Sequence, residues 1–293
     1  MKKKILLYCF KKHFAFAAKH PNLWNYRPIA SYLGRMKTFV LSQCKSDFVK
    51  LDKISMTLPE NEFLHLVLFE HEGLVSKIAK NLVKKENNVL VLGANIGYWT
   101  CFLAQIIGNS GKVYAFEPSP ENFEYLEKNV SNNNFKNIIL EKKAVADKSY
   151  QTKLYLSNGT MDNRIYDPNL NRESIKIDVI KLDEYFKNSN LKLDYIQSNI
   201  QGADFAAILG MKELLKKSPN LKLMIEFAPK MAKEYGTDPN SFIDLLSSEN
   251  FKFYEVWWYA KKAKLITSEK LKDYVKNNTD TNLLCTRENL QFN

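Results

Sequence analysis

Hydrophobic positions along the chain follow two periods that alternate. The segment 74–85, LVSKIAKNLVKK, repeats its apolar residues every three or four positions, which predicts an amphipathic helix. NNVLVLG at 87–93 is instead a continuous apolar run that ends in glycine, as is typical of a buried strand. YWTCFLAQIIG at 98–108 returns to the helical period, and GKVYAFEP at 111–118 returns to a strand.

The same alternation continues to the end of the chain. The remaining predicted strands are KNIILEKKAV, LKLDYIQSNI, LKLMIEFAP, FKFYEVWWYA and TNLLCTRE, and the remaining predicted helices are SPENFEYLEKNVSNN, GADFAAILGMKELLKK and FIDLLSSENF. Strands that alternate with helices favour one doubly wound, mostly parallel sheet over residues 86–293. The segment 147–187 is longer and contains short alternating pieces such as TKLYL and IKIDVIKL. Ligands of such sheets bind at the carboxyl ends of the strands, so the residues after each strand are candidates for a site.

The N-terminal part of the chain lacks this alternation. Residues 1 to about 45 predict two helices, and FVKLDKISMTL at 48–58 is predicted to be extended. We therefore expect a helical N-terminal extension over 1–60 and a second domain over 61–293.

The first residues combine a basic start with an apolar stretch, as a targeting segment does. Their apolar stretch is interrupted by Lys11-Lys12 after six residues, which is too short for a signal peptide or a membrane span. An amphipathic helix fits better. Packing of this helix on the main domain is favoured, and peripheral membrane contact through residues 1–20 stays open.

A glycine-rich turn follows the first strand of the alternating region. Gly93-Ala94-Asn95-Ile96-Gly97 opens a helix, so its N–H groups favour a carboxylate or phosphate, but its spacing is not that of a dinucleotide site. Glu117 ends the next strand, where a carboxylate can accept both hydroxyls of a ribose. Ala144-Val145 after the third strand offers small apolar contacts to an adenine ring. Together these residues predict a nucleoside pocket.

Composition narrows the partners and the compartment. The chain of 293 residues has a net charge of +11, which favours anionic partners and leaves an anionic acceptor open. The lysines are scattered, without a basic stripe that carries interleaved aromatic residues, so no nucleic-acid partner is expected. Cys9, Cys44, Cys101 and Cys285 have neither metal nor redox spacing, which predicts reduced thiols in a cytoplasmic protein.

Several segments together resemble the FkbM-type S-adenosylmethionine-dependent methyltransferases. The matching segments are GANIGYWT, VYAFEPSPENFEYLEKNV, AVADK, DNRIY, IKLDEY, NIQGADFAAILGM and a closing TNLLC, within roughly Phe63 to Arg287. The resemblance implies a Rossmann-like, seven-stranded methyltransferase sheet whose last strand is antiparallel. It also implies S-adenosylmethionine as the cofactor and methyl transfer to a hydroxyl of a sugar, glycan or small natural product.

The resemblance also implies a set of site residues. The expected cofactor contacts are Glu72, Ser76, Gly93, Ala94, Asn95, Gly97, Glu117, Pro118, Ala144, Val145 and Asn199. Asn199 and Glu226 are the expected catalytic residues, and no metal is expected at the site. Asp204, His71 and Asp162 are further candidates for a general base.

The chain departs from the family pattern where the family has charged residues. Val91 stands where the family usually has an acid, and Gln197-Ser198-Asn199 replaces its usual K-x-D. An amide can orient a hydroxyl, but it cannot take a proton at neutral pH. Since the two strands concerned are expected to be neighbours, we predict that Val91 and Asn199 both remove negative charge from the same small volume, around the methionine end and methyl of the cofactor. Cofactor binding should then be weak.

Three functions therefore stay open. An S-adenosylmethionine-dependent O-methyltransferase is favoured by the strand-end residues. A degenerate methyltransferase fold that acts as a non-catalytic binding or scaffolding protein is the alternative, and it is favoured by Val91 and Asn199. A nucleotide-sugar or NAD enzyme is disfavoured by the G-x-x-x-G spacing.

Overall fold

The computed structural model describes Tyr32, Arg35 and residues 47–59, 73–157, 159, 161–256 and 263–292. Some predictions lie outside the described residues: the helices within 1–45, the membrane contact of residues 1–20, His71, Glu72 and the last four residues of FKFYEVWWYA. In the part of the chain that is described, no helix combines the length and the apolar character that crossing a membrane requires.

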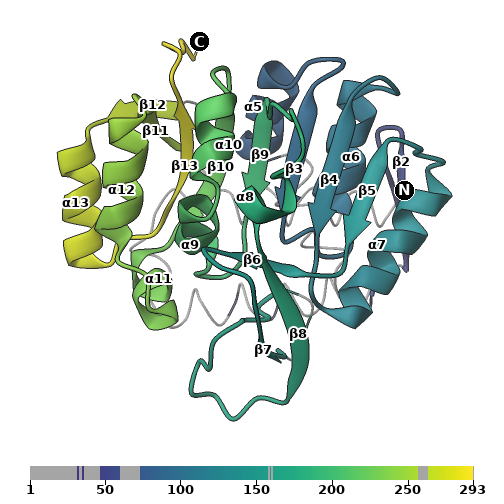
Figure 1. Ribbon diagram of the computed structural model, residues 1–293. Coiled ribbons are helices and arrows are strands. Elements are labelled where there is room, and N and C mark those ends of the chain that lie inside the picture. Colours follow the sequence, from purple (N-terminus) through teal and green to yellow (C-terminus); the bar gives the residue numbers. More distant parts are fainter. Residues whose placement is uncertain are drawn as a thin grey trace.

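A mixed sheet forms the centre of the molecule (Figure 1), and among the described residues it has eight strands in the order β12-β11-β13-β10-β9-β3-β4-β5. The strands are β3 (Asn88–Leu92), β4 (Lys112–Phe116), β5 (Ile138–Glu141), β9 (Tyr195–Ser198), β10 (Lys222–Phe227), β11 (Lys252–Val256), β12 (Ala263–Ile266) and β13 (Thr281–Thr286). The pairs from β5 to β10 are parallel, whereas β13 runs antiparallel to both of its neighbours. The predicted α/β sheet with an antiparallel last strand is confirmed, and β12 adds an antiparallel edge strand.

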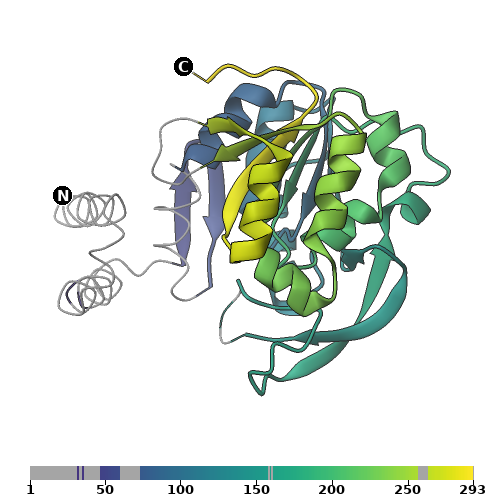
Figure 2. The same cartoon turned by 90° about the vertical axis from the view of Figure 1, so that its left-hand side faces the viewer.

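Helices cover both faces of this sheet (Figures 1 and 2). One face carries α5 (Leu74–Leu82), α6 (Tyr98–Ile107) and α7 (Pro120–Asn132). The other carries α8 (Leu182–Tyr185), α9 (Asp204–Leu209), α10 (Lys212–Lys217), α11 (Pro229–Tyr235), α12 (Pro239–Ser248) and α13 (Ser268–Asn277). Alternate residues of a strand point to opposite faces, so Val89 and Val91 pack with the first group and Leu90 and Leu92 with the second. Burial on both faces explains the unbroken apolar run.

A second, smaller sheet was not predicted. It consists of β6 (Ala144–Ala146), β7 (Tyr150–Tyr155) and β8 (Ser174–Lys181), in the order β6-β8-β7. The prediction of one sheet over 86–293 is therefore wrong for residues 144–181, because KNIILEKKAV divides into β5 in the large sheet and β6 in the small one. The predicted helix at 202–217 is divided as well. A Cβ at Gly210 would lie 2.4 Å from the carbonyl oxygen of Ala146, so only glycine lets this turn rest on β6.

The segment FVKLDKISMTL is extended, as predicted. It forms an antiparallel hairpin of β1 (Phe48–Leu51) and β2 (Ile54–Thr57). Ile54 and Met56 are fully buried in the same hydrophobic cluster as residues of α6. This part of the predicted helical extension is thus a pair of strands packed on the main body, and the domain boundary at residue 60 stays a prediction.

Candidate functional site

A cavity of about 420 Å³ lies where β3, β4, β9 and β10 end. The strand order changes direction here, since β4 and β9 flank β3 on opposite sides. Segments of the small sheet and of the loop between β7 and β8 complete its wall. The cavity brings together these predicted site residues: Gly93, Ala94, Asn95, Glu117, Pro118, Ala144, Val145, Asn199 and Glu226.

Two predicted cofactor residues, Ser76 and Gly97, do not line the cavity. Ser76 is buried in α5, and its hydroxyl donates to the carbonyl oxygen of Gly73 at 2.8 Å. Gly97 precedes α6 with a φ of 96°, and a Cβ there would lie 2.9 Å from Leu126 Cδ1. Glycine at position 97 is therefore explained by the turn before α6 and by the close packing of α6 on α7.

Glu117 directly follows β4 and is only 5% exposed. Its Oε2 accepts the N–H of Asn95 at 2.8 Å, and its Oε1 accepts the N–H of Ser119 at 3.0 Å and the side-chain amide of Asn122 at 3.4 Å. Burial raises the pKa of Glu117 to about 7, although the hydrogen bonds favour the carboxylate and oppose this rise. Glu117 thus fixes the glycine loop and also lines the cavity.

The glycine loop approaches the end of β9 very closely. Gly93 has a φ of +77°, and a Cβ there would lie 2.3 Å from the carbonyl oxygen of Asn199. The N–H groups of Gly93 and Ala94 both donate to the carbonyl oxygen of Phe116, at 3.0 and 2.9 Å. Backbone contacts therefore hold the loop between the ends of β4 and β9.

Asp204 organises the loop that follows β9 and does not line the cavity. It is 2% exposed, and its Oδ1 accepts the hydroxyl of Ser198 at 2.6 Å and the N–H of Ile200 at 3.1 Å. Burial raises the pKa of Asp204 to about 6, against the effect of these hydrogen bonds. The carboxylate accepts hydrogen bonds from its own loop and does not reach the cavity, so the structure does not support Asp204 as a general base.

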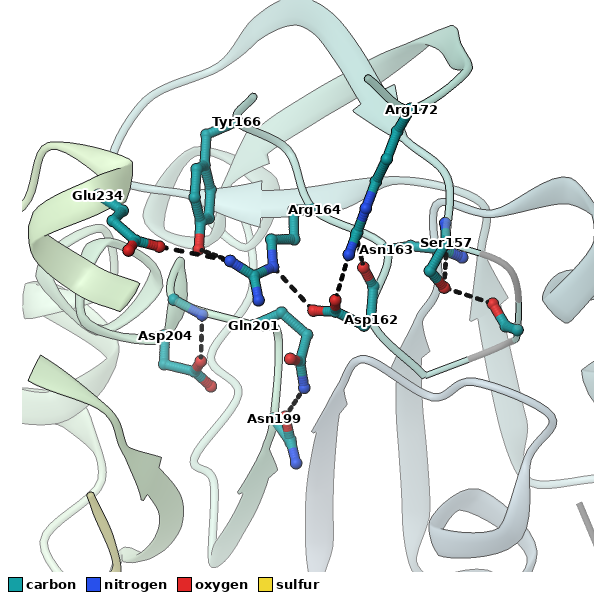
Figure 3. A network of polar contacts seen from close by, with 12 residues as sticks. Ser157, Asp162, Asn163, Arg164, Tyr166, Arg172, Asn199, Gln201, Asp204 and Glu234 are labelled. Carbon is teal, nitrogen blue, oxygen red and sulfur yellow. Dashed lines mark hydrogen bonds and ion pairs between the residues drawn. The ribbon is translucent and has the colours of Figure 1, made fainter. Parts of the chain in front are cut away.

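The loop held by Asp204 presents two amides to the cavity (Figure 3). The Nε2 of Gln201 donates to the Oδ1 of Asn199 at 2.8 Å. This pair retains the Nδ2 donor of Asn199 and the Oε1 acceptor of Gln201 for a ligand. An uncharged donor beside an uncharged acceptor suits a hydroxyl group, which both donates and accepts.

The loop between β7 and β8 carries a network of ion pairs at the cavity wall (Figure 3). The Nε of Arg164 donates to the Oδ1 of Asp162 at 2.7 Å, and Arg172 donates to both the carboxylate and the carbonyl oxygen of Asp162. Partial burial raises the pKa of Asp162, but the hydrogen bonds and charges of Arg172 and Arg164 outweigh it and hold this pKa below its ordinary value. A carboxylate with a lowered pKa is a poor base, so Asp162 serves as a structural anchor.

The same network ties the loop to α11. Arg164 Nη1 donates to the hydroxyl of Tyr166 at 2.9 Å and lies 3.4 Å from Oε2 of Glu234. The ring of Tyr166 meets that of Tyr235 edge-on, with centroids 6.0 Å apart. Side chains therefore tie the loop to α11, and the backbone of Arg164 pairs with that of Tyr155 in β7 through hydrogen bonds of 2.8 and 3.1 Å.

Val91 and Gln197, which both depart from the family pattern, are direct partners across β3 and β9. Val91 is fully buried in the cluster beneath α6 and does not line the cavity. Gln197 accepts the hydroxyl of Tyr195 at 3.0 Å. The two strands are neighbours, as predicted, but the prediction that Val91 and Asn199 alter one small volume is wrong. The Val91 side chain points into the core, whereas Asn199 lies at the cavity.

Sequence reasoning missed several residues of the cavity wall. They include Trp99, Asn122, Lys143, Met161, Asn163, Ile165 and Gln201. A signal existed for three of them: Gln201 lies in the segment NIQGAD, Asn163 lies in DNRIY, and Asn122 follows Glu117 by five residues.

The sheet order and the strand-end cavity define a Rossmann-like methyltransferase fold. The Methyltransferase FkbM domain matches residues 92–253, which is more than half of the chain. The chain therefore belongs to the FkbM methyltransferase family, and this membership supports the predicted S-adenosylmethionine as cofactor. No protein of curated function matches this sequence.

Solved structures of methyltransferases are similar at low identity. An rRNA methylase from Streptococcus thermophilus is 14% identical, with coverage of 74% of this chain and 95% of that chain and a TM-score of 0.40. An S-adenosylmethionine-dependent O-methyltransferase from Thermotoga maritima is 15% identical (74% and 65%, TM-score 0.39). Fibrillarin from Aeropyrum pernix, with natively bound S-adenosylmethionine, is 14% identical (73% and 73%, TM-score 0.40). These likenesses are too distant to carry a function to this chain.

Proposed function

We propose that this protein is an S-adenosylmethionine-dependent O-methyltransferase that acts on a hydroxyl of a sugar, glycan or small natural product. The observation that carries the proposal is the buried Glu117 at the end of β4, which orders the glycine loop and lines the cavity. A volume of about 420 Å³ lies within the range of small-molecule sites, which is roughly 300–1,000 Å³.

The wall divides into two parts with different tasks. In the proposed assignment, Glu117 accepts the ribose hydroxyls, Ala144 and Val145 contact the adenine ring, and the loop at 93–95 receives the methionine end. When bound, S-adenosylmethionine supplies an activated methyl group, so the protein has mainly to align the acceptor. Asn199 orients the acceptor hydroxyl, and Glu226 at the end of β10 receives its proton.

The charges of the wall favour an uncharged acceptor. Lys143 is the one basic residue among the described residues of the wall, and it pairs with Glu141 at 3.1 Å. The acids of the wall are Glu117, Asp162 and Glu226, of which Asp162 is paired with Arg164 and Arg172. A neutral hydroxyl compound is therefore favoured over the anionic acceptor that the net charge left open.

The domain boundary at residue 60 and a cytoplasmic location stay proposals.

Titration calorimetry of the full chain with S-adenosylmethionine and S-adenosylhomocysteine tests the proposal. We expect saturable binding of both ligands, followed by release of S-adenosylhomocysteine when neutral sugars or glycosides are added. Binding of both ligands without turnover on a broad panel of hydroxyl acceptors would favour the non-catalytic alternative. Failure to bind either ligand would overturn the proposed function.

A further inference from the structure

We propose that Asn129 is a positioning residue of the cofactor site, through which the N-terminal hairpin β1–β2 holds the glycine loop in its binding conformation. This inference rests on the proposed function. Asn129 lies on α7 outside the cavity wall, and it is completely buried.

Asn129 of α7 and Asn133, which follows the end of α7 one turn later, take the place of a neighbouring strand along β2. The Oδ1 of Asn129 accepts the N–H of Thr57 at 2.6 Å, and its Nδ2 donates to the carbonyl oxygen of Thr57 at 2.9 Å. Asn133 makes the same pair of bonds to Ser55, at 2.8 and 2.7 Å. Each amide satisfies one donor and one acceptor of the strand, as a ladder partner would.

The two asparagines differ in a third hydrogen bond. The Nδ2 of Asn129 also donates to the carbonyl oxygen of Ile96, at 2.7 Å. The corresponding Nδ2 of Asn133 donates instead to the carbonyl oxygen of Asn129 within α7, at 2.7 Å. Both residues therefore bind the hairpin, but Asn129 also holds the glycine loop.

The bond to Ile96 acts at a sensitive point of the loop. Ile96 lines the cavity, and the preceding residue, Asn95, gives its N–H to Glu117. Asn95 has a φ of 49°, in the left-handed region that asparagine adopts more readily than most residues, and its Oδ1 accepts the N–H of Ile96 at 2.6 Å. With the carbonyl of Ile96 fixed on one side and the N–H of Asn95 on the other, the intervening turn has little freedom to move. Loss of the Asn129 donor leaves a buried carbonyl without that bond, which favours a rearranged loop.

The matched pair Asn129→Asp and Asn133→Asp separates this role from the stability of the hairpin. Each change keeps an acceptor for the strand and places a carboxylate oxygen against backbone carbonyls. Only in Asn129→Asp does this oxygen face the carbonyl oxygen of Ile96 in the glycine loop. We expect Asn129→Asp to weaken S-adenosylhomocysteine binding about tenfold, the equivalent of one lost buried hydrogen bond, and Asn133→Asp to leave the dissociation constant near that of the parent.

Hydrogen–deuterium exchange of residues 93–97 in the ligand-free protein gives a second measurement, which needs no cofactor. Because Asn129 is buried and Asn133 is half-buried, exchange of residues 93–97 is compared with that of β10 in the same variant, and we expect the ratio to rise in Asn129→Asp and not in Asn133→Asp. If Asn129→Asp does not fold, the milder pair Asn129→Ser and Asn133→Ser carries the same comparison. Equal affinity and an equal exchange ratio in the two members of a pair would overturn the inference. A parent protein that binds no S-adenosylhomocysteine would refute the proposed function, and the exchange data would still decide the role of Asn129.

Discussion

The two walls of the cavity are built in different ways. On the cofactor side, backbone N–H groups of the glycine loop donate to the carboxylate of the buried Glu117 and to the carbonyl oxygen of Phe116. On the acceptor side, the loop between β7 and β8 has one backbone bridge to β7, and it is tied to α11 by partly exposed ion pairs, such as that of Arg164 with Glu234. Buried backbone contacts are costly to lose and insensitive to salt, whereas exposed ion pairs contribute little and are screened. The cofactor side should therefore be rigid and the acceptor side adjustable.

The largest effect is expected from Gly93→Ala. The added Cβ would meet the carbonyl oxygen of Asn199 at 2.3 Å, at a φ of +77°. We expect the free energy of unfolding to fall by about 3 kcal/mol, because strain and overpacking add. Gly236→Ala is the control, since φ is +99° and ψ is 13° there but nothing lies within 4 Å of the new Cβ. Denaturant unfolding measures both, and equal losses would contradict a close approach of the loop to β9.

Glu117→Ala should mainly affect the cofactor. Loss of hydrogen bonds to a charged group predicts cofactor binding weaker by about 1.5–3 kcal/mol. Glu124→Ala, which removes an exposed acid of α7, should leave binding unchanged. Calorimetry with S-adenosylhomocysteine compares both variants with the parent. An unchanged dissociation constant in Glu117→Ala would show that the nucleoside lies elsewhere.

The raised pKa of Glu117 makes cofactor binding dependent on pH. Ribose hydroxyls donate to the carboxylate, so binding favours the charged form, and affinity rises as pH increases through the pKa of about 7. From pH 8 to pH 6 the affinity should fall about tenfold, since one pH unit below a pKa leaves about a tenth of the group charged. Glu117→Gln should remove this dependence. A profile that keeps its slope in the variant would assign it to another group.

The same pKa predicts an opposite trend for stability. Burial favours the protonated carboxyl in the folded state, so between its ordinary pKa of 4.5 and about 7 the folded protein binds more protons than the unfolded chain. Without ligand, this contribution to the free energy of unfolding is fully present below pH 4.5 and is lost as pH rises toward 7. Denaturant unfolding of the ligand-free protein at several pH values measures this trend. Asp204, with a pKa of about 6, contributes in the same direction, so Glu117→Gln should reduce the slope without abolishing it.

The smallest effect is expected from Glu234→Gln on the acceptor side. The pair with Arg164 is partly exposed, with 16% and 40% of the side chains accessible, so its loss should cost about 1 kcal/mol or less. We expect a KM for the acceptor raised a few-fold, less so at high salt, with cofactor affinity unchanged. Glu213→Gln, which breaks the exposed pair with Lys216, is the control and should change neither constant. A large change in cofactor affinity would mean that the two walls are coupled.

Sequence patterns located the cofactor side better than the acceptor side, for a physical reason. The glycine loop and Glu117 end consecutive strands, and parallel strands bring such ends together whatever the rest of the chain does. Asp162, Arg172 and Glu234 meet only through the folding of the long loop onto α11. No local period encodes such a meeting, so Asp162 and Asp204 were open as bases until their partners were known.

By itself, the sequence determined the alternation of strands and helices, the glycine turn and the acid at the end of β4. These features follow from local propensity and from burial on both faces of a parallel sheet. Only the tertiary structure decided which face each strand residue occupies and which residues it contacts. In the structure, β5 and β6 belong to different sheets, and Val91 is buried in the core beside its strand partner Gln197. Asp204 accepts its hydrogen bonds within its own loop. The physical reason is that register, facing and hydrogen-bond partners depend on contacts between segments that are far apart in the chain.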